Sequence, residues 1–410
     1  MGFPWAKVLP LVGRSFLGVL TSPFFWLVVI LIWLQYQKMQ KSKEALFGVR
    51  HPVFPVVAAA IGYGIIGGLV GSLLMVFFGV SISGLGIGYL WLLAIFLMLI
   101  NPRFLCFSYA GGILALFSLI TGHPKVDIPS LMGLVAILHL VESVLILISG
   151  HIDPLPVYVR NYFGQVVGGF NLQKFWPIPL AVMATFVNLP PEAGGEIIRM
   201  PDWWPLIRPW GEWGSAEVIY GIFPVVAALG YGEVALTRLP REKTRHSALN
   251  LSVFSLILLG LAVVASHFPQ LAVLPALFSP LGHEAVIYIG RNSELKGPSR
   301  FVAPGRGVMV LDVIRGSPAD RVRLRPGDVI LSIDHFSVNS RVELAQVLAL
   351  AGSSFELEYV SGQTHLVRLQ VYRRSGEPLG VIPVPDPGDP ANVDYASGSL
   401  LKKLWQRIRR

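Results

Sequence analysis

Charged residues are scarce in this chain, and their scarcity excludes an ordinary soluble protein. Only 14% of the 410 residues are charged, whereas 53% are hydrophobic, and soluble domains usually carry about 25% charged residues. The apolar residues are concentrated before residue 290, while 291–410 has ordinary polarity. The pattern indicates a polytopic membrane protein with a polar C-terminal region. The formal net charge of +9 suits a surface that faces anionic lipid.

Cysteine is almost absent. The one cysteine, Cys106, lies within an apolar run, so no intrachain disulfide can form. The spacing of cysteines and histidines along the chain contains no metal-binding motif. We therefore expect no metal site and no cofactor.

Catalytic signatures are missing as well. An intramembrane zinc protease needs H-E-x-x-H on one helix, but the fifth position after His283 and Glu284 is Ile287. The nucleophile elbow G-x-S-x-G of serine hydrolases does not occur. The sequence therefore predicts no catalytic residue, and we expect a protein that is not an enzyme.

Four ionisable residues nevertheless fall inside apolar segments: His139, Glu142, His283 and Glu284. A charge at membrane depth costs a few kcal/mol on insertion scales, so such residues usually face the bundle interior and are paired. We expect each pair to be satisfied internally or by the backbone of neighbouring helices. A transporter that uses them as an ion path is an alternative.

The apolar segments predict eight or nine membrane spans within residues 1–290. They lie near 16–34, 53–78, 82–100, 104–121, 129–149, 176–189, 217–236, 248–266 and 270–289, and several reach the roughly 20 residues that a spanning helix needs. The basic loops 38–50 and 237–246 are expected in the cytoplasm, and the tryptophan-rich loop 188–215 outside. This arrangement places the C-terminal region in the cytoplasm.

Glycines recur four residues apart in the segment 53–78. Gly62, Gly64 and Gly67 fit the letters of the dinucleotide fingerprint, but no strand or helix start frames them. Gly64 with Gly68, and Gly67 with Gly71, would instead form a small-residue face. We therefore expect close helix packing along this face.

The polar region 307–385 has the pattern of a small α+β domain. Residues 307–314 and 329–333 alternate as strands do, and Ser317 with Pro318 favours a short helix between them. A helix is predicted over 340–351, and a hairpin over 355–373 with its turn at Ser361-Gly362. The stretches "GSPA" and "LRPGDVILSI" in this order resemble a bacterial PDZ domain of the permuted type.

The PDZ resemblance implies a peptide site, because the family adds an extended peptide to a sheet edge beside a helix. The loop that binds a peptide carboxylate would be "PLGVI", followed by the edge strand, with the helix 340–351 as the other wall. The residues expected to bind peptide are Arg374, Leu379, Gly380, Val381, Ile382, Val342 and Leu348. The alternative is that "LGVIPV" is only a closing strand.

The chain ends in a basic amphipathic segment, 399–410, after the linker 386–398. Leu400, Leu401, Leu404, Trp405 and Ile408 would share one helical face. The residues expected at a membrane surface are Lys402, Lys403, Trp405, Arg407, Arg409 and Arg410. Anionic lipid is the expected partner rather than nucleic acid, with a disordered basic tail as the alternative.

Taken together, a polytopic α-helical membrane domain, a linker at 291–306, a PDZ-like domain and a basic tail resemble the MinJ-like family of bacterial division-site proteins. The stretches "EALFGVRHPVF" and "SPLGHEAVIYIGR" extend the likeness. The resemblance implies a cell-membrane adaptor in septation that bridges partners similar to the polar scaffold DivIVA and the ATPase MinD. A PDZ-regulated intramembrane protease and a transporter remain the alternatives.

Overall fold

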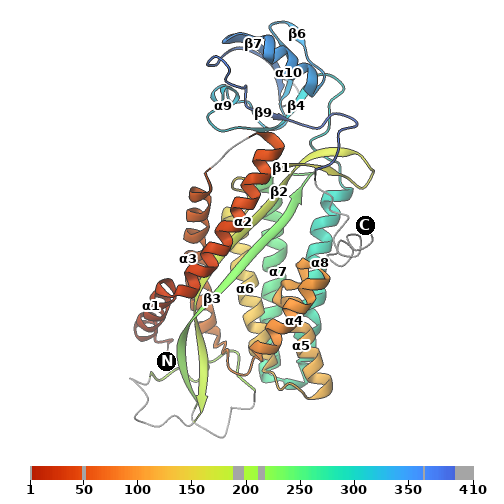
Figure 1. Cartoon of the computed structure of the whole chain (residues 1–410). Coiled ribbons are helices and arrows are strands. Elements are labelled where there is room, and N and C mark those ends of the chain that lie inside the picture. The colour runs from red at the N-terminus through yellow and green to blue at the C-terminus, as the bar shows by residue number, and fades with distance from the viewer. Residues whose placement is uncertain (1, 49–51, 188–197, 211–217, 363–364, 393–410) are drawn as a thin grey trace, which may run out of the picture.

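The computed structural model describes residues 2–48, 52–187, 198–210, 218–362 and 365–392. A bundle of apolar helices and a long β-hairpin form one part, and a small α+β domain sits at one end of the bundle (Figure 1). The helices of the bundle are α1 (Trp5–Thr21), α2 (Pro23–Phe47), α3 (Val53–Phe78), α4 (Ile87–Ile100), α5 (Phe107–Thr121), α6 (Ile128–Ser149), α7 (Pro240–His267) and α8 (Val273–Lys296), with 3-10 turns η1 (Pro102–Leu105) and η3 (Pro269–Leu271).

Fewer helices than expected are long enough to cross a membrane. By length and composition, α3, α6, α7 and α8 with its leading turn qualify among the described residues, and α1 with α2 would add a fifth as one bent pair. The helices α4 and α5 have only 14 and 15 residues. The count of four or five replaces the predicted eight or nine.

Two of the expected spans are strands. Strand β2 (Val166–Val187) and strand β3 (Val218–Ala235) form one antiparallel hairpin, and β1 (Leu155–Arg160) pairs with the start of β2. The segment 176–189 contains Pro177 and Pro179, which would each cost about 3 kcal/mol inside a helix. In the strand both are tolerated, because backbone nitrogens at alternate positions point away from β3. Ala181, two residues further on, uses this direction to donate its N–H to Ser72 Oγ at 2.9 Å.

The glycine face of α3 packs mainly against this hairpin. A Cβ atom on Gly64 or Gly68 would lie 2.1 Å or 2.0 Å from the carbonyl oxygens of Pro177 and Pro179. Only glycine therefore lets the helix approach the strand so closely. The prediction of a close-packing face is confirmed, but its main neighbour is a strand and not another helix; Gly67 on the adjacent stripe does contact α6.

The C-terminal domain follows the predicted order of elements. They are β4 (Val308–Val313), α9 (Pro318–Arg321), β5 (Val329–Ile333), β6 (Phe336–Ser337), α10 (Arg341–Leu350), β7 (Ser354–Ser361), β8 (His365–Tyr372) and β9 (Val381–Pro383). The sheet order is β8-β7-β5-β4-β9, with β6 beside β5. Ser317 caps α9 as predicted. Helix α10 ends at Leu350, and the residue that caps its C-terminus, Ala351, has an extended backbone.

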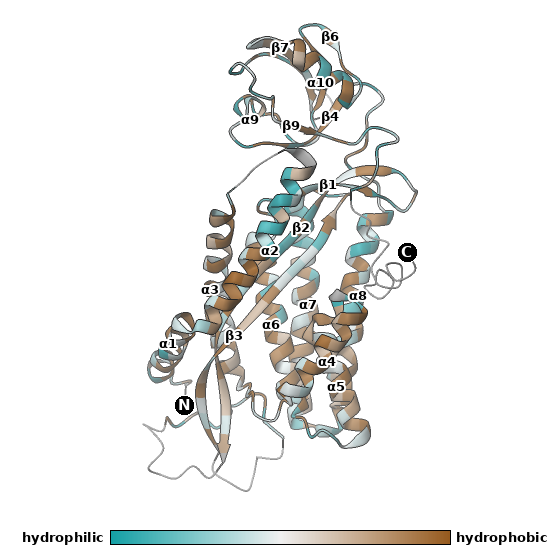
Figure 2. Ribbon diagram, in the orientation of Figure 1, coloured by the Kyte–Doolittle hydropathy of each residue, from teal (hydrophilic) through white to brown (hydrophobic). Residues whose placement is uncertain are grey.

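The C-terminal domain is packed directly onto the hairpin part. Helix α8 continues to Lys296, and Phe301 is fully buried against Phe170 of β2, with ring centroids 5.4 Å apart. The N–H of Gly168 donates to the carbonyl of Phe301 at 2.8 Å. The region 291–306, predicted as a linker, is therefore partly a helix end and partly a buried connection. Hydrophobic residues dominate the lower helices, and hydrophilic residues gather towards this junction (Figure 2).

Candidate functional site

Strand β9 is the edge strand of the C-terminal sheet, and the loop before it contains Gly380. Gly380 has φ +81°, a conformation that favours glycine. The N–H of Ile314 donates to the carbonyl of Gly380, and the N–H of Val384 donates to Met309 of β4. Because strand residues alternate, the N–H and C=O of Val381 face the opposite, outer edge. This edge has the geometry for pairing with an added strand.

The side chains of the predicted peptide site fall into different environments. Leu379, Val381 and Leu348 pack into the core of the C-terminal domain. Ile382 lies on the other face of β9, where it is buried in the core shared with the hairpin part. Leu348 and Ile382 therefore do not line an open groove, whereas the backbone around Val381 remains at the sheet edge.

A cleft of about 540 Å³ follows the exposed face of α10. Its lining residues are Arg341, Val342, Ala345, Gln346, Ala349, Asp386 and Asp389. Val342 is 63% exposed and lines this cleft, and its role in peptide binding stays a prediction. Sequence reasoning did not single out Ala345 and Ala349, whose small side chains leave the space open.

Tyr158 of β1 lies where the β9 edge meets the start of α10. Its hydroxyl donates to the carbonyl of Pro383 at 2.9 Å, and the guanidinium of Arg341 lies 5.2 Å from the centre of its ring. Arg341 is in turn held by Asp389 at 2.5 Å. Sequence reasoning missed Tyr158, since nothing in the local pattern of β1 indicates a contact 225 residues away.

Arg373 and Arg374 precede the loop of Gly380 that is predicted to bind a peptide carboxylate, and their surroundings differ. The guanidinium of Arg373 donates to the carbonyls of Leu348, Ala351 and Gly352. It therefore closes the end of α10, where the free carbonyls favour a cation. Arg374 is exposed and remains the arginine that can attract a carboxylate.

A second cleft, of about 580 Å³, lies between the C-terminal domain and the ends of α2 and α3. Lys43 forms an ion pair with Asp153 at 3.1 Å on its wall. Burial lowers the pKa of Lys174 to about 8, although Asp153 acts in the opposite direction. Burial also raises the pKa of Asp312 to about 6, against the N–H of Val313 that stabilises its charged form. The cleft therefore holds groups that titrate near neutral pH.

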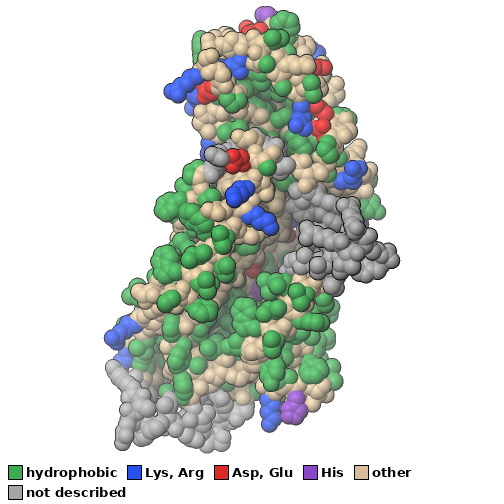
Figure 3. Space-filling view, in the orientation of Figure 1, with side chains coloured by type: hydrophobic (Ala, Val, Ile, Leu, Met, Phe, Trp, Pro, Cys, Tyr) green, Lys and Arg blue, Asp and Glu red, His purple; other side chains and the backbone are tan. Residues whose placement is uncertain are grey.

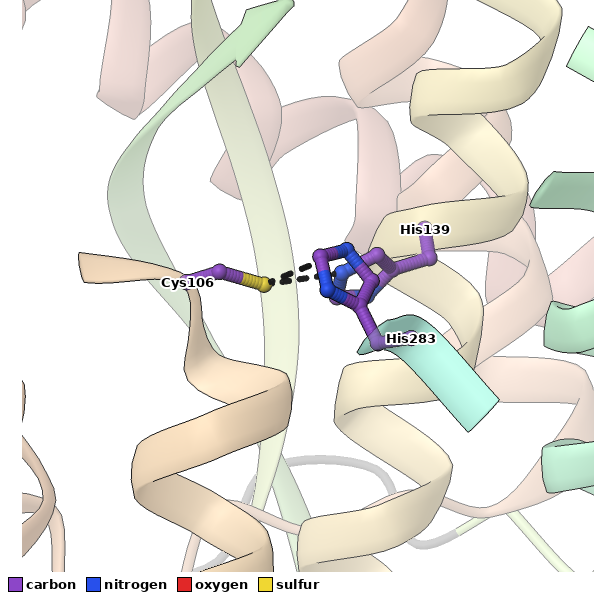
Figure 4. A group of neighbouring side chains, drawn as sticks. All are labelled: Cys106, His139 and His283. Carbon is purple, nitrogen blue, oxygen red and sulfur yellow. Dashed lines mark hydrogen bonds between the residues drawn. The ribbon is translucent and has the colours of Figure 1, made fainter. Parts of the chain in front are cut away.

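The predicted intramembrane residues meet in an unexpected way. His139 Nε2 lies 3.1 Å from Cys106 Sγ, and His283 Nε2 lies 3.8 Å from the same sulfur. The two imidazole rings are 5.0 Å apart (Figure 4). The hydrogen bonds of His139 are to Cys106 and to the carbonyl of Val135, rather than to Glu142. Cys106, which the spacing left without partners, thus sits with two histidines, and the expectation that no such cluster forms was wrong.

Glu284 has polar partners outside this cluster. Its carboxylate accepts from the hydroxyl of Tyr109 at 2.6 Å and pairs with Arg103 at 3.0 Å. The expected mutual pairing of His283 with Glu284 is therefore replaced by separate partners. Glu142 is partly buried on α6. The residues of the amphipathic tail, 399–410, lie outside the described part of the chain.

Comparison with known proteins identifies two likenesses. The family model "PDZ domain" matches residues 288–376, which leaves out β9 and its loop. Over 273 residues, the chain is 22% identical to the cell division topological determinant MinJ of Bacillus subtilis, covering 66% of this chain. The match spans 65% of that protein, which is less than two thirds of its length.

Two solved structures also match part of the chain. The PDZ domain of the SdrC-like protein from Listeria monocytogenes is 22% identical, with a TM-score of 0.18, and the match covers 20% of this chain and 92% of that domain. The corresponding domain from Listeria innocua is 26% identical, with a TM-score of 0.17, and covers 19% of this chain and 92% of that domain.

Proposed function

We propose, from the premise that this chain is a MinJ-like protein with a PDZ domain, that it is a membrane-anchored adaptor in bacterial division-site selection. Its partners would be cytoplasmic proteins captured through the PDZ domain, with DivIVA-like and MinD-like proteins as the candidates that the resemblance implies. The observation that carries the proposal is the edge strand β9, whose end at Pro383 lies near the start of α10 and its open cleft.

Anchoring in the membrane is supported by the surface of the bundle. Large apolar side chains point outward from the helices, for example Leu92 at 69% and Ile120 at 82% exposure. Such exposure is costly in water and natural in lipid. The middle of the face in Figure 3 is covered by hydrophobic side chains, whereas charged ones gather at the end with the C-terminal domain. The far end holds an aromatic cluster that includes Phe3, Trp5 and Trp203, which suits a membrane interface.

The cytoplasmic side is assigned to the PDZ domain. The basic segments 38–47 and 237–246, expected as loops, form the end of α2 and the approach to α7. Both lie on the side of the bundle that carries the PDZ domain, and positive charge favours the cytoplasm. A reporter that is active only outside the cytoplasm, fused after Arg410, should stay silent. Activity of that fusion would reverse the orientation.

Peptide capture would use backbone and helix together. An added strand would pair with the outer edge at Val381, its carboxylate would lie at the loop of Gly380, and its side chains would enter the cleft beside Val342 and Ala345. Val342 is apolar, so the cleft favours an apolar peptide side chain near its start.

The test uses the full-length chain in detergent, because Phe301 and Ile382 would be exposed in an isolated fragment. Fluorescent peptides carrying the C-termini of the candidate division proteins would be titrated against the wild type and Ala345→Trp. The indole should fill the cleft and weaken binding at least ten-fold, since about 1.4 kcal/mol corresponds to that factor.

Leu366→Trp is the matched control, because Leu366 is 56% exposed on β8 at the opposite edge of the sheet. Equal affinity of both variants and the wild type would place the partner on another surface. The proposal assigns no catalysis to the chain. Specific cleavage of a membrane substrate that is lost in a folded His283→Ala variant would favour the intramembrane protease instead.

A further inference from the structure

Three donor atoms from three separate helices converge beneath the surface of the bundle. Cys106 is the N-cap of α5, His139 lies in the middle of α6, and His283 lies in α8. Their Sγ, Nε2 and Nε2 atoms all lie within 4.8 Å of one another. Figure 4 shows the sulfur pointing towards both rings. The cluster belongs neither to the PDZ domain nor to its peptide site.

Hydrogen bonds within the described part of the chain do not satisfy every nitrogen of this cluster. The Nδ1 atom of His139 is 2.7 Å from the carbonyl of Val135, so this nitrogen carries the proton and Nε2 presents a lone pair. The Nδ1 atom of His283 is buried and has no hydrogen-bond partner in the described part of the chain, and an unpaired buried nitrogen is costly. A cation at the centre would bind the Nε2 lone pairs of both rings together with the thiolate.

The spacing matches a tetrahedral transition-metal ion. Zinc bonds of about 2.3 Å to sulfur and 2.0–2.1 Å to nitrogen place sulfur and nitrogen ligands about 3.6 Å apart. The two separations from Cys106 Sγ, 3.1 Å and 3.8 Å, lie on either side of this value. One thiolate and two imidazoles suit zinc and are poor ligands for magnesium or calcium.

Neighbouring groups support such a site. The carbonyl of Val135 orients His139, as outer partners do for metal-bound histidines. The N–H of Ser108 lies 3.4 Å from Cys106 Sγ, so the positive end of α5 favours the thiolate. The ring of Phe254 packs against both imidazoles, with centroid distances of 5.6 Å. These contacts orient the ligand side chains in the absence of an ion.

We propose that Cys106, His139 and His283 bind one zinc ion that fastens the start of α5 to α6 and α8, with the fourth position open to water or a small ligand. The site lies outside the adaptor function, and its failure would leave that function untouched. Three ligands distant in the chain form it, so the missing H-E-x-x-H pattern does not argue against it.

The experiment measures metal in the full-length protein purified in detergent. After incubation with Zn²⁺ and removal of excess, mass spectrometry should find about one zinc per chain. Cys106→Ser is the sharpest variant, since serine is a good helix N-cap and should preserve α5. Zinc content should fall to background in Cys106→Ser and in His139→Ala. His123→Ala, which changes an exposed histidine after α5, is the matched control and should keep the metal.

Cobalt supplies a second readout that identifies the ligands. Co²⁺ added to the metal-free wild type should give a sulfur-to-metal charge-transfer band in the near ultraviolet, and Cys106→Ser should lose it. Zinc binding should also raise the unfolding temperature of the wild type but not of Cys106→Ser. Wild type that takes up no zinc, or a folded Cys106→Ser variant that retains it fully, would overturn the proposal, as would uptake of copper alone. Peptide affinity, measured in parallel, distinguishes this failure from failure of the adaptor function.

Discussion

The hydroxyl of Tyr158 donates to the carbonyl of Pro383 at 2.9 Å, and this bond joins the hairpin part to the edge of the PDZ sheet. Since alternate residues of β9 face opposite edges, the carbonyl of Pro383 points outward, in the same direction as Val381. A peptide added along β9 would need that carbonyl for its own N–H. Tyr158 therefore occupies one end of the peptide edge.

Removing this hydroxyl should strengthen peptide binding. In Tyr158→Phe, the Pro383 carbonyl is free to accept from a peptide, and the lost internal bond is worth about 1 kcal/mol. We expect an affinity increase of about five-fold for peptides long enough to reach Pro383. Titration with peptides of three and six residues tests this. The short peptide serves as the control and should show no gain; the same gain for both lengths would contradict the role of Tyr158.

Arg373 and Arg374 should respond differently to truncation. Arg373→Ala leaves carbonyls at the end of α10 without their cation and should destabilise the chain by about 1.5–3 kcal/mol, the usual worth of hydrogen bonds to a charged group. Arg374→Ala should leave stability unchanged and weaken peptide binding modestly. Thermal unfolding and peptide titration of both variants separate these effects. A stability loss in Arg374→Ala equal to that in Arg373→Ala would show that the two are interchangeable.

Asp312 should make stability depend on pH. Its folded pKa of about 6 is above its ordinary value of 3.8, because burial disfavours the carboxylate. The folded state therefore binds the proton more tightly than the unfolded state. The resulting contribution of Asp312 to the free energy of unfolding is complete below about pH 4 and is lost as pH rises through 6. Asp312→Asn should flatten this dependence and stabilise the chain at pH 7.5 by roughly 3 kcal/mol at most. Unfolding temperatures measured from pH 4.5 to 7.5 check it; an unchanged slope in the variant would rule Asp312 out.

Gly380 should be intolerant of any side chain. A Cβ atom there would lie 2.2 Å from Cβ of Ser317, and φ is already +81°. Gly380→Ala should therefore destabilise the PDZ domain beyond the 1–2 kcal/mol expected from the left-handed backbone alone. Gly376→Ala is matched to it, because Gly376 has φ +75° and open space. Equal losses of stability in the two variants, measured by thermal unfolding, would mean that Ser317 moves aside without a measurable cost.

The sequence anticipated the PDZ domain because its signals are local. Ser317 before Pro318, the alternation over 329–333 and the helical spacing after Ser340 each act within a few residues, and the corresponding elements appear at those places. Hydropathy alone gave wrong predictions for 176–189 and 217–236. An apolar strand that is buried between helices has the same mean hydropathy as a membrane-spanning helix. The prolines at 177 and 179 were the signal against a helix.

The metal ligands could not be predicted in this way. Cys106, His139 and His283 are 33 and 144 positions apart along the chain, and only the packing of α5, α6 and α8 brings them together. Tyr158 is a similar case, because its partner lies on a different domain. Contacts that depend on the meeting of distant elements leave no pattern within either element.

Strand β2 gives the molecule an unbroken mechanical link. Near its start, Gly168 bonds to Phe301 beneath the PDZ domain, and near its end Met183 forms a bridge with Ser81 beside the tryptophan-rich end. The 15 residue steps from Gly168 to Met183 span about 50 Å of extended chain. An extended backbone that is hydrogen-bonded along its length resists stretching. A displacement of the loop at Ser81 is therefore transmitted along β2 to the contact between Gly168 and Phe301, beneath the PDZ domain at the opposite end of the bundle.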